Sequence, residues 1–233
     1  MRVADPDHGA RFIDFPGRRC VIEKPTLPPA VREFTESYVA ENAVFTAARG
    51  RAAEVGIMPI QPGGGATLRL LATAIAAKSV VEVGTGAGVS GLWLLYGMRP
   101  DGVLTTIDIE PEHQRIARKA FTEAGFPPGR TRLIAGRALE VLPRLTDGAY
   151  DMVVVGGDKS EFDAYVREAY RLLRVGGVLA VDNALGGGKV VDPAARDPES
   201  VALREVVKSL RDTDEWTSAL LPVGDGLLIA VKR

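Results

Sequence analysis

Glycines at three alternate positions separate a short apolar run from an apolar segment of helical character. The run covers residues 79–83, and the glycines occupy positions 84, 86 and 88. In such a strand–turn–helix arrangement the backbone can close on a nucleotide-like ligand, because no Cβ atoms stand in the way. A second apolar run ends in Asp108, just over twenty residues beyond the glycines, and a carboxylate there can accept hydrogen bonds from both hydroxyls of a ribose. The combination predicts a nucleotide-type cofactor site.

Two cofactors are compatible with this layout. Residues 86–91 match the dinucleotide fingerprint G-x-G-x-x-G, which predicts NAD. Residues 82–88 resemble the first motif of S-adenosylmethionine-dependent methyltransferases, in which an acidic residue closes the strand and the glycines pass the methionine part of the cofactor. Because a pyrophosphate needs a helix N-terminus free of nearby negative charge, Glu82 suits a ligand with an ammonium group better. Glycines that serve only a tight turn are the remaining alternative.

Length and composition exclude several other classes. The 233 residues lie within the range of one α/β domain with a substantial core. The 29 basic and 30 acidic side chains nearly balance, so nothing indicates binding to nucleic acid or to an anionic membrane. Cys20 is the only cysteine, which excludes an intrachain disulfide and a cysteine-rich metal site. No apolar run is long enough to span a bilayer and no signal-peptide pattern occurs, which predicts a soluble cytoplasmic protein.

The first part of the chain is expected to lie outside the sheet. Residues 1–27 carry scattered charges and no regular period, which predicts a loosely ordered arm. Helical spacing begins at Pro28 and continues toward Val55, and a further helix is expected over residues 66–77. Residues 58–65 break the pattern between them, and this segment either walls the cofactor site or is a plain connector. The expected organisation is an arm, 1–27, and a single domain, 28–233, with helices over 28–77 and a cofactor-binding core over 78–233.

The core alternates apolar runs with helical segments. Strands are predicted over residues 79–83, 103–107, 131–135, 150–155, 177–181, 216–221 and 227–231, and helices over 89–98, 111–125, 138–142, 162–173 and 200–210. Such alternation implies an α/β fold with a parallel sheet covered on both faces. The last two strands are joined by residues 222–226, too few for a crossover helix, so they must be antiparallel. A terminal hairpin on a doubly wound, mainly parallel seven-stranded sheet is typical of the methyltransferase fold and favours S-adenosylmethionine over NAD.

From about residue 50 to the C-terminus, the chain resembles the catechol/caffeoyl-CoA type of small O-methyltransferases, in particular its actinobacterial branch. The resemblance rests on the sequences at residues 82–90, 106–108, 136–138, 158–159, 182–183 and 222–227. It implies a class I, Rossmann-like fold and transfer of a methyl group from S-adenosylmethionine to a hydroxyl, often one of a vicinal pair. It also implies a Mg²⁺ or similar ion beside that hydroxyl, and a homodimer.

The same resemblance assigns residues to the cofactor. Glu82, Gly84 and Thr85 are expected at the methionine part and Ser90 at its carboxylate end. Asp108 is expected at the ribose, and the backbone of Ala138 at the adenine. The remaining expected contacts are Ile60, Gly86, Ile109, Arg137 and Gly156.

Methyl transfer from a sulfonium ion is an in-line displacement, so the site mainly has to align the acceptor oxygen, the methyl group and the sulfur. It must also help the hydroxyl lose its proton, which a nearby lysine ammonium or metal ion does. By the resemblance the proposed base is Lys159, with Asp158 beside it as a second expected catalytic residue. The alternative is that Lys159 is an ordinary solvent-exposed lysine in a loop. Without the family resemblance this would be the favoured interpretation, because most lysines in proteins are exposed.

The metal site departs from the family pattern. The family holds its ion with an Asp directly after the fourth strand and an Asp-Asn pair after the fifth. The pair is present as Asp182 and Asn183, but Gly156 stands where the first Asp is expected. A hard cation such as Mg²⁺ needs several oxygen ligands in near-octahedral order. We therefore expect metal binding to be weak or absent.

Three functions are compatible with the sequence. The first is an O-methyltransferase that acts on a hydroxyl of a small, catechol-like molecule. The second is an S-adenosylmethionine-binding protein that has lost catalysis and acts as a sensor or interaction partner. The third is an NAD-dependent oxidoreductase, which only the overlapping glycine fingerprint supports.

Overall fold

The computed structural model describes residues 11–15, 18–22 and 28–233, and the chain divides into two compact units, Met1–Thr35 and Glu36–Arg233. In the first unit, strands β1 (Arg11–Phe15) and β2 (Arg18–Ile22) pair antiparallel, and helix α1 (Pro29–Glu36) ends at the boundary. The two strands were not predicted, because five-residue strands joined by two residues are too short for an alternating pattern to stand out. The rest of the predicted arm lies outside the described residues, so its looseness and the boundary at residue 28 stay predictions.

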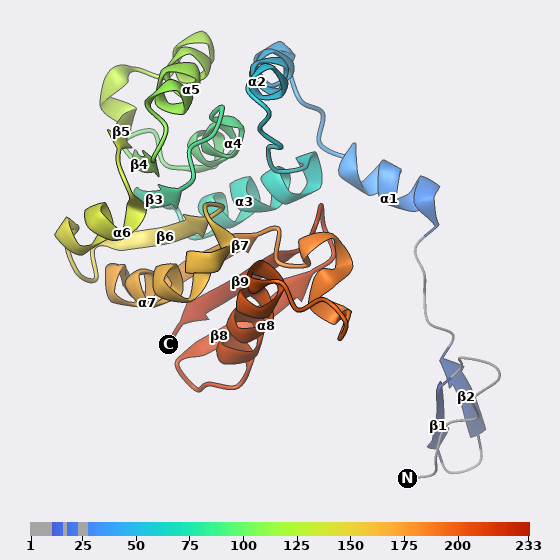
Figure 1. Ribbon diagram of the computed structural model, residues 1–233. Coiled ribbons are helices and arrows are strands. Elements are labelled where there is room, and N and C mark those ends of the chain that lie inside the picture. The colour runs from blue at the N-terminus through green and yellow to red at the C-terminus, as the bar shows by residue number, and fades with distance from the viewer. Residues whose placement is uncertain (1–10, 16–17, 23–27) are drawn as a thin grey trace. The chain divides into compact units, whose positions relative to one another are not determined.

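The second unit is built on a seven-stranded sheet with the strand order β5-β4-β3-β6-β7-β9-β8 (Figure 1). Its strands are β3 (Ser79–Val83), β4 (Val103–Asp108), β5 (Thr131–Ala135), β6 (Tyr150–Val155), β7 (Leu173–Asp182), β8 (Trp216–Leu221) and β9 (Leu227–Lys232). Strands β3 to β7 pair in parallel, whereas β9 runs antiparallel to both β7 and β8. The predicted doubly wound, mainly parallel sheet with a terminal hairpin is confirmed.

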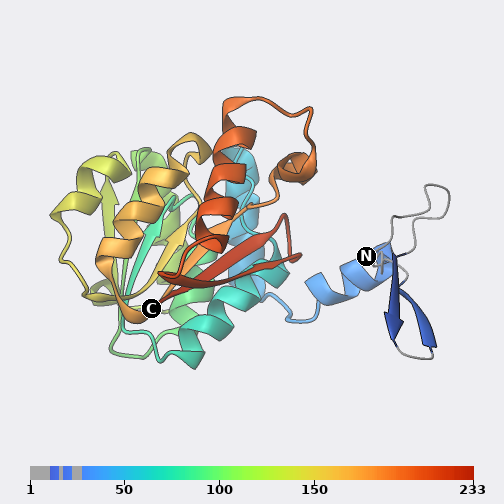
Figure 2. The same ribbon diagram turned by 90° about the horizontal axis from the view of Figure 1, so that it is seen from below.

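Two groups of helices cover the two faces of this sheet (Figures 1 and 2). One core contains side chains of α2 (Ala43–Glu54), α3 (Pro62–Ala74), α4 (Val89–Gly97) and α5 (Pro111–Glu123), and the other those of α6 (Ala138–Val141), α7 (Phe162–Leu172) and α8 (Pro198–Arg211). Successive residues of a strand therefore enter different cores, as Val80 and Val81 do. This explains why the strands are continuous apolar runs. None of the described helices is both long and apolar enough to cross a membrane.

The helices before β3 differ from the prediction. The expected continuous segment toward Val55 is instead α1 and α2, separated by residues 37–42. Helix α2 begins after Asn42, whose side-chain oxygen accepts hydrogen bonds from the N–H groups of Val44 at 3.0 Å and Phe45 at 3.3 Å. Helix α3 begins at Pro62 rather than at residue 66, because proline is favourable in the first turn and the glycines that follow it continue the helix.

Position 65 in α3 requires glycine, because the indole of Trp93 occupies the space that a side chain would fill. A Cβ atom at Gly65 would lie 2.2 Å from Cδ1 of Trp93, which is 1% exposed. We expect Gly65→Ala to lower the free energy of unfolding by about 1–3 kcal/mol, because overpacking outweighs the gain of about 1 kcal/mol in helix propensity. The matched control is Gly50→Ala in α2, where a Cβ would meet nothing within 4 Å, and it should stabilise the protein by about 0.5–1 kcal/mol. Urea unfolding measures both; shifts of the same sign would contradict the packing argument.

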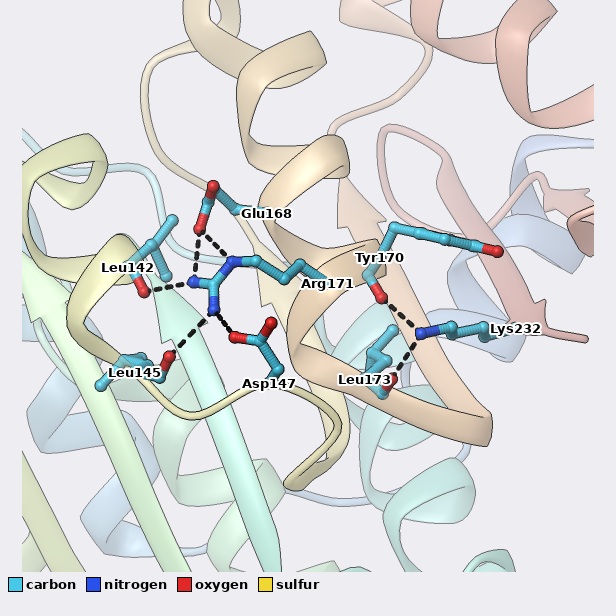
Figure 3. Close-up of polar contacts among 8 residues, drawn as sticks. All are labelled: Leu142, Leu145, Asp147, Glu168, Tyr170, Arg171, Leu173 and Lys232. Carbon is cyan, nitrogen blue, oxygen red and sulfur yellow. Dashed lines mark hydrogen bonds and ion pairs between the residues drawn. The ribbon is translucent and has the colours of Figure 1, made fainter.

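Helix α7 is anchored at its C-terminal end by Arg171 (Figure 3). The guanidinium donates hydrogen bonds to the main-chain oxygens of Leu142 at 2.7 Å and Leu145 at 3.0 Å. It also pairs with the carboxylates of Glu168, at 2.7 Å, and Asp147. Arg171 thus ties α7 to the segment that follows α6, and the residues before and within α7 reach the site described below.

A second cation, Lys232 at the end of β9, contacts the same end of α7. Its ammonium group donates hydrogen bonds to the main-chain oxygens of Tyr170 at 2.7 Å and Leu173 at 2.9 Å, and it lies 4.4 Å from the centroid of the Tyr170 ring. Positive charge is favourable there because the last carbonyl groups of a helix lack partners within the helix. The terminal hairpin therefore helps to fix the helix (Figure 3).

Candidate functional site

A cavity of about 340 Å³ opens where strands β3, β4, β5 and β6 end. Ligands of doubly wound sheets bind at the carboxyl ends of the parallel strands. Every residue predicted for the cofactor lines this cavity: Ile60, Glu82, Gly84, Thr85, Gly86, Ser90, Asp108, Ile109, Arg137, Ala138 and Gly156. Of the other predicted site residues, Asp158 and Asp182 line it, whereas Lys159 and Asn183 do not. The structure brings the predicted residues together, and their contacts with a ligand stay predictions.

The segment before α3 walls the cavity, which settles the two alternatives left open by the sequence. Residues 57–60 all line it. Arg49 of α2 donates a hydrogen bond to the main-chain oxygen of Ile60 at 2.8 Å, and its guanidinium pairs with the carboxylate of Glu41 at 2.6 Å. The hydrogen bond to Ile60 ties the wall to α2, and the ion pair with Glu41 orients the guanidinium that donates it.

Gly84 directly follows β3 and can only be glycine. Its φ is 92°, in the left-handed region, and a Cβ there would lie 2.9 Å from the carbonyl carbon of Gly156. Its N–H donates to the main-chain oxygen of Ile107 at 2.8 Å, which continues the ladder between β3 and β4 by one residue. The turn therefore exposes its backbone at the cavity with two other chain segments packed closely around it.

Glu82 ends a chain of buried hydrogen bonds. Its Oε2 accepts from the hydroxyl of Thr106 at 2.6 Å, and the hydroxyls of Thr106 and Thr85 lie 2.7 Å apart. Since Thr106 uses its only proton on Glu82, Thr85 donates to Thr106 and in turn accepts from Nε2 of Gln114 at 2.9 Å. All donors thus point toward the carboxylate. Gln114 was not predicted as a site residue, although its position three residues before Ala117 places it on the buried face of α5.

The second oxygen of Glu82 has no hydrogen-bond partner among the described residues. Glu82 is 1% exposed, and its buried Oε1 accepts no hydrogen bond from the described part of the chain. Burial raises the pKa of Glu82 from 4.5 to about 7, although the hydroxyls of Ser90 and Thr106 nearby lower it, and the negative charge of Asp108 raises it further. Ser90 lies close without completing a hydrogen bond to Oε1. A buried acceptor of this kind suits a positively charged donor from a ligand.

Asp108 at the end of β4 organises the glycine turn. Its Oδ2 accepts from the N–H of Gly86 at 2.8 Å, and its Oδ1 accepts from the N–H of Glu110 at 3.0 Å. Oδ1 also lies 3.1 Å from Nδ1 of His113. Because a carboxylate oxygen has two acceptor positions, Oδ2 can still accept one hydrogen bond from a ligand. Glu110 and His113 also line the cavity and were not singled out in the sequence.

Glu161 links two elements at the cavity and was also missed. It is the last residue of a short 3-10 turn (Lys159–Glu161) and directly precedes α7. Its Oε1 accepts from Nη2 of Arg137 at 2.7 Å and its Oε2 from the hydroxyl of Tyr165 at 2.5 Å. Burial and the neighbouring Glu161 carboxylate raise the pKa of Tyr165, so its hydroxyl stays a donor. All three side chains line the cavity.

The two predicted catalytic residues occupy different positions in this turn. Oδ1 of Asp158 accepts from the N–H of Ser160 at 2.9 Å and from its hydroxyl at 2.7 Å, and these bonds lower the pKa of Asp158. Asp158 therefore caps the turn. Lys159 is half-buried, and within the described residues its ammonium group forms no salt bridge; its positive charge acts on the carboxyl of Asp182. This interaction places Lys159 near the end of β7.

Asp182 and Asn183, the predicted metal ligands, directly follow each other at the end of β7. Oδ1 of Asp182 accepts from the N–H of Asn183 at 2.8 Å. Burial raises the pKa of Asp182 to about 6. Asn183 adopts a φ of 59°, and its buried Oδ1 has no partner within the described residues.

These residues are too few for a firmly held divalent ion. They offer one carboxylate and one amide oxygen, Gly156 has no side chain, and Oδ1 of Asp158 is engaged in its own turn. Nowhere in residues 28–233 do three His, Cys, Asp or Glu side chains form a group that could hold a metal ion. Mg²⁺ prefers near-octahedral oxygen coordination. The donor set does not fit such an ion, and we derive no catalytic step through one.

Comparison with known proteins identifies the family. The family described as O-methyltransferase matches residues 35–233. A probable O-methyltransferase of Mycobacterium tuberculosis (strain H37Rv) is 50% identical over 219 residues, which cover 94% of this chain and 96% of the relative. A solved protein of Corynebacterium glutamicum has a TM-score of 0.81 and 33% identity, and the match covers 87% of this chain and 95% of that one.

A second solved structure similar to this chain is that of a protein with a described activity. The O-methyltransferase TomG of Streptomyces achromogenes, which is involved in tomaymycin synthesis and was solved in complex with SAM, has a TM-score of 0.78 and 30% identity. The match covers 86% of this chain and 94% of TomG. The strand order, the terminal hairpin and these similarities agree on a class I methyltransferase fold. From residue 35 to its end, this chain belongs to the O-methyltransferase family.

Proposed function

We propose that this O-methyltransferase takes its methyl group from S-adenosylmethionine and transfers it to a hydroxyl of a small, catechol-like acceptor. The observation that carries the proposal is the unpartnered Oε1 of Glu82 in the wall of the cavity. A buried acceptor without a donor is costly, and the α-ammonium group of this cofactor is a charged donor of the required kind. A pyrophosphate beside the Glu82 carboxylate would be unfavourable, which disfavours NAD.

The rest of the cavity suits the other parts of the cofactor. Gly84 lets the main chain approach the methionine part, and Ser90 offers a hydroxyl to the carboxylate. Asp108 retains an acceptor position for a ribose hydroxyl, while Ile109 and Ala138 offer apolar surface to the base. When bound, the cofactor supplies an electrophilic methyl group on a sulfonium ion. The residues of the chain have to bind and orient it against the acceptor.

Activation of the acceptor hydroxyl falls to Lys159 in this proposal. As a neutral amine its side chain accepts the proton of the hydroxyl, and as an ammonium group it stabilises the oxyanion left when that proton passes to water. Within the described residues the side chain has no salt bridge, so it is available to the acceptor. Asp158 supports it by capping the turn in which Lys159 lies. Asp182 and Asn183 bind Mg²⁺ weakly or not at all, because the carboxylate expected at Gly156 is missing.

Replacing Gly156 by Asp tests the role of the missing carboxylate. A Cβ at Gly156 would lie 3.8 Å from the nearest of the neighbouring atoms, the main-chain oxygen of Val83, so a Cβ is accommodated without a clash. We expect wild-type activity to change little between EDTA and millimolar Mg²⁺, and Gly156→Asp to bind Mg²⁺ and become metal-dependent. Gly156→Asn is the control of equal size without the charge. Calorimetry with Mg²⁺ and methyl-transfer assays measure both; stoichiometric Mg²⁺ in the wild type, with activity lost in EDTA, would refute the idea.

Binding and turnover separate the proposed function from its competitors. Thermal shift with S-adenosylmethionine, S-adenosylhomocysteine and NAD should show stabilisation by the first two only. Methyl transfer to a panel of catechols should then show turnover. Stabilisation without turnover on any catechol would favour a cofactor-binding sensor, and stabilisation by NAD alone would favour an oxidoreductase.

Two further expectations come from the sequence. We expect a homodimer in the cytoplasm, as the resemblance and the composition indicate. Light scattering across micromolar concentrations tests the first, and a monomer at all of them would contradict it. Fractionation of cells tests the second.

A further inference from the structure

One end of the cavity is lined by both apolar and charged side chains. Ile109 from the segment after β4 and Ala138 from the start of α6 provide apolar surface, and Glu161 provides a carboxylate. Ile109 and Ala138 follow β4 and β5, on the side of β4 away from β3 and Glu82. Glu161 comes from the segment after β6 and is joined to this end by its hydrogen bond from Arg137, which follows β5. If the proposed function holds, the base of the cofactor lies at this end. The inference below rests on that function.

The carboxylate of Glu161 is held from two directions. Arg137, in the loop after β5, donates to Oε1, and Tyr165 of α7 donates to Oε2. Tyr165 is 4% exposed, so this contact is sheltered from water. Each oxygen has used one of its two acceptor positions. Glu161 can therefore accept a further hydrogen bond without moving, and Arg137 offsets its charge.

We propose that Glu161 accepts a hydrogen bond from the 6-amino group of the adenine and so makes the site selective for adenine over a 6-oxo purine. An amino group donates, whereas a 6-oxo group only accepts and would face a carboxylate that also only accepts. Sites built to hydrogen-bond one polar group reject an analogue that leaves their own polar group unpaired. Arg137 and Tyr165 are positioning residues, because they act on the base through Glu161.

Two other carboxylates lie near this end of the cavity, and each is less suited. Asp158 directs Oδ1 at Ser160 within its own turn. Glu110 is exposed at the start of α5, where its main chain rather than its side chain contacts Asp108. Glu161 is the one among the three that side chains from two different elements fix at the wall.

The test compares S-adenosylhomocysteine with S-inosylhomocysteine, which differs only by a 6-oxo group in place of the 6-amino group. Calorimetry gives the ratio of the two dissociation constants without turnover. We expect the wild type to prefer S-adenosylhomocysteine by roughly 10- to 100-fold, the range for a hydrogen bond to a charged group. Glu161→Gln should reduce this preference to a few-fold, because an amide can accept from the amino group or donate to the oxo group.

One variant serves as the control. Glu140→Gln changes an exposed carboxylate of α6 outside the cavity wall and should keep the wild-type ratio. A wild type that binds both nucleosides equally, or a ratio that persists unchanged in Glu161→Gln, would overturn the inference. A wild type that binds neither nucleoside would overturn the proposed function as well, so the two failures are distinguishable.

Discussion

Replacing Lys159 by methionine should lower kcat for methyl transfer by about 10²- to 10⁴-fold, the usual contribution of a positioned acid or base. Methionine keeps the length and the apolar stem of lysine and removes the ammonium group. Lys159 lies beside Asp182 at the end of β7, outside the wall formed by the cofactor residues. The affinity for S-adenosylmethionine should therefore change little while kcat falls.

Two further variants show what the lysine does. Lys159→Arg retains the positive charge but cannot give up its proton near neutral pH, so it should remain close to the methionine variant if Lys159 is a base. Recovery of activity in Lys159→Arg would instead indicate that the charge alone stabilises the acceptor oxyanion. Lys208→Met, an exposed position on α8, controls for the loss of a surface charge. A kcat for Lys159→Met equal to that of Lys208→Met would refute both roles.

Most strands of the sheet were predictable because each is indicated by the residues within it and directly beside it. Residues 79–83 and 150–155 are short apolar runs that a glycine ends, and the structure forms strands with those bounds. Strand β7 is longer than the predicted residues 177–181, since it begins at Leu173 and pairs with β6 across a register shift. Such a shift depends on the neighbouring strand and leaves no local signal.

The helices before the sheet were less predictable. Three consecutive glycines predict a break, yet Gly63 to Gly65 are helical in the structure. Gly65 packs so closely on Trp93 that a Cβ would clash there, and no period within either segment reveals this contact. Tertiary packing overrode the local propensity here.

The candidate site divides in the same way. The glycine turn, Glu82 and Asp108 lie at strand ends and form a sequence motif. Their residue types and spacing were therefore sufficient to predict that they line one cavity. Gln114 and Glu161 act through partners more than twenty residues away in sequence, Thr85 and Arg137. Contacts of that kind depend on how helices pack onto the sheet, which one sequence does not reveal.

The binding of S-adenosylmethionine should release close to one proton at pH 6, and its affinity should rise by roughly tenfold between pH 5.5 and 7. The cause is Glu82, whose pKa in the folded protein is raised by burial from 4.5 to about 7. Below pH 7 its carboxyl is mostly protonated, whereas an ammonium group beside it favours the ionised form. The amino group of the cofactor stays protonated over this range, since α-amino groups titrate near pH 8. Proton release therefore reports on Glu82.

The same shift has a consequence for the protein without cofactor. A carboxyl group with a raised pKa binds more protons in the folded state, so the free energy of unfolding falls as pH rises from 4.5 through 7. The shift corresponds to a loss of about 3 kcal/mol relative to a neutral residue at this position. Glu82→Gln keeps a donor and an acceptor at the position but does not titrate, so it should remove this loss in urea unfolding.

Calorimetry in buffers of different ionisation enthalpy counts the protons, and Glu82→Gln isolates the contribution of Glu82. Asp182, with its pKa raised to about 6, also titrates in this range, but it is present in both proteins and cancels in the comparison. Glu82→Gln should bind the cofactor roughly 10- to 100-fold more weakly near pH 8, because a charge-assisted hydrogen bond becomes a neutral one. The difference should shrink toward pH 5.5, where the wild-type carboxyl is itself neutral. Equal proton release by the two proteins would mean that the cofactor's ammonium group lies elsewhere, and the unpartnered Oε1 would then need another donor.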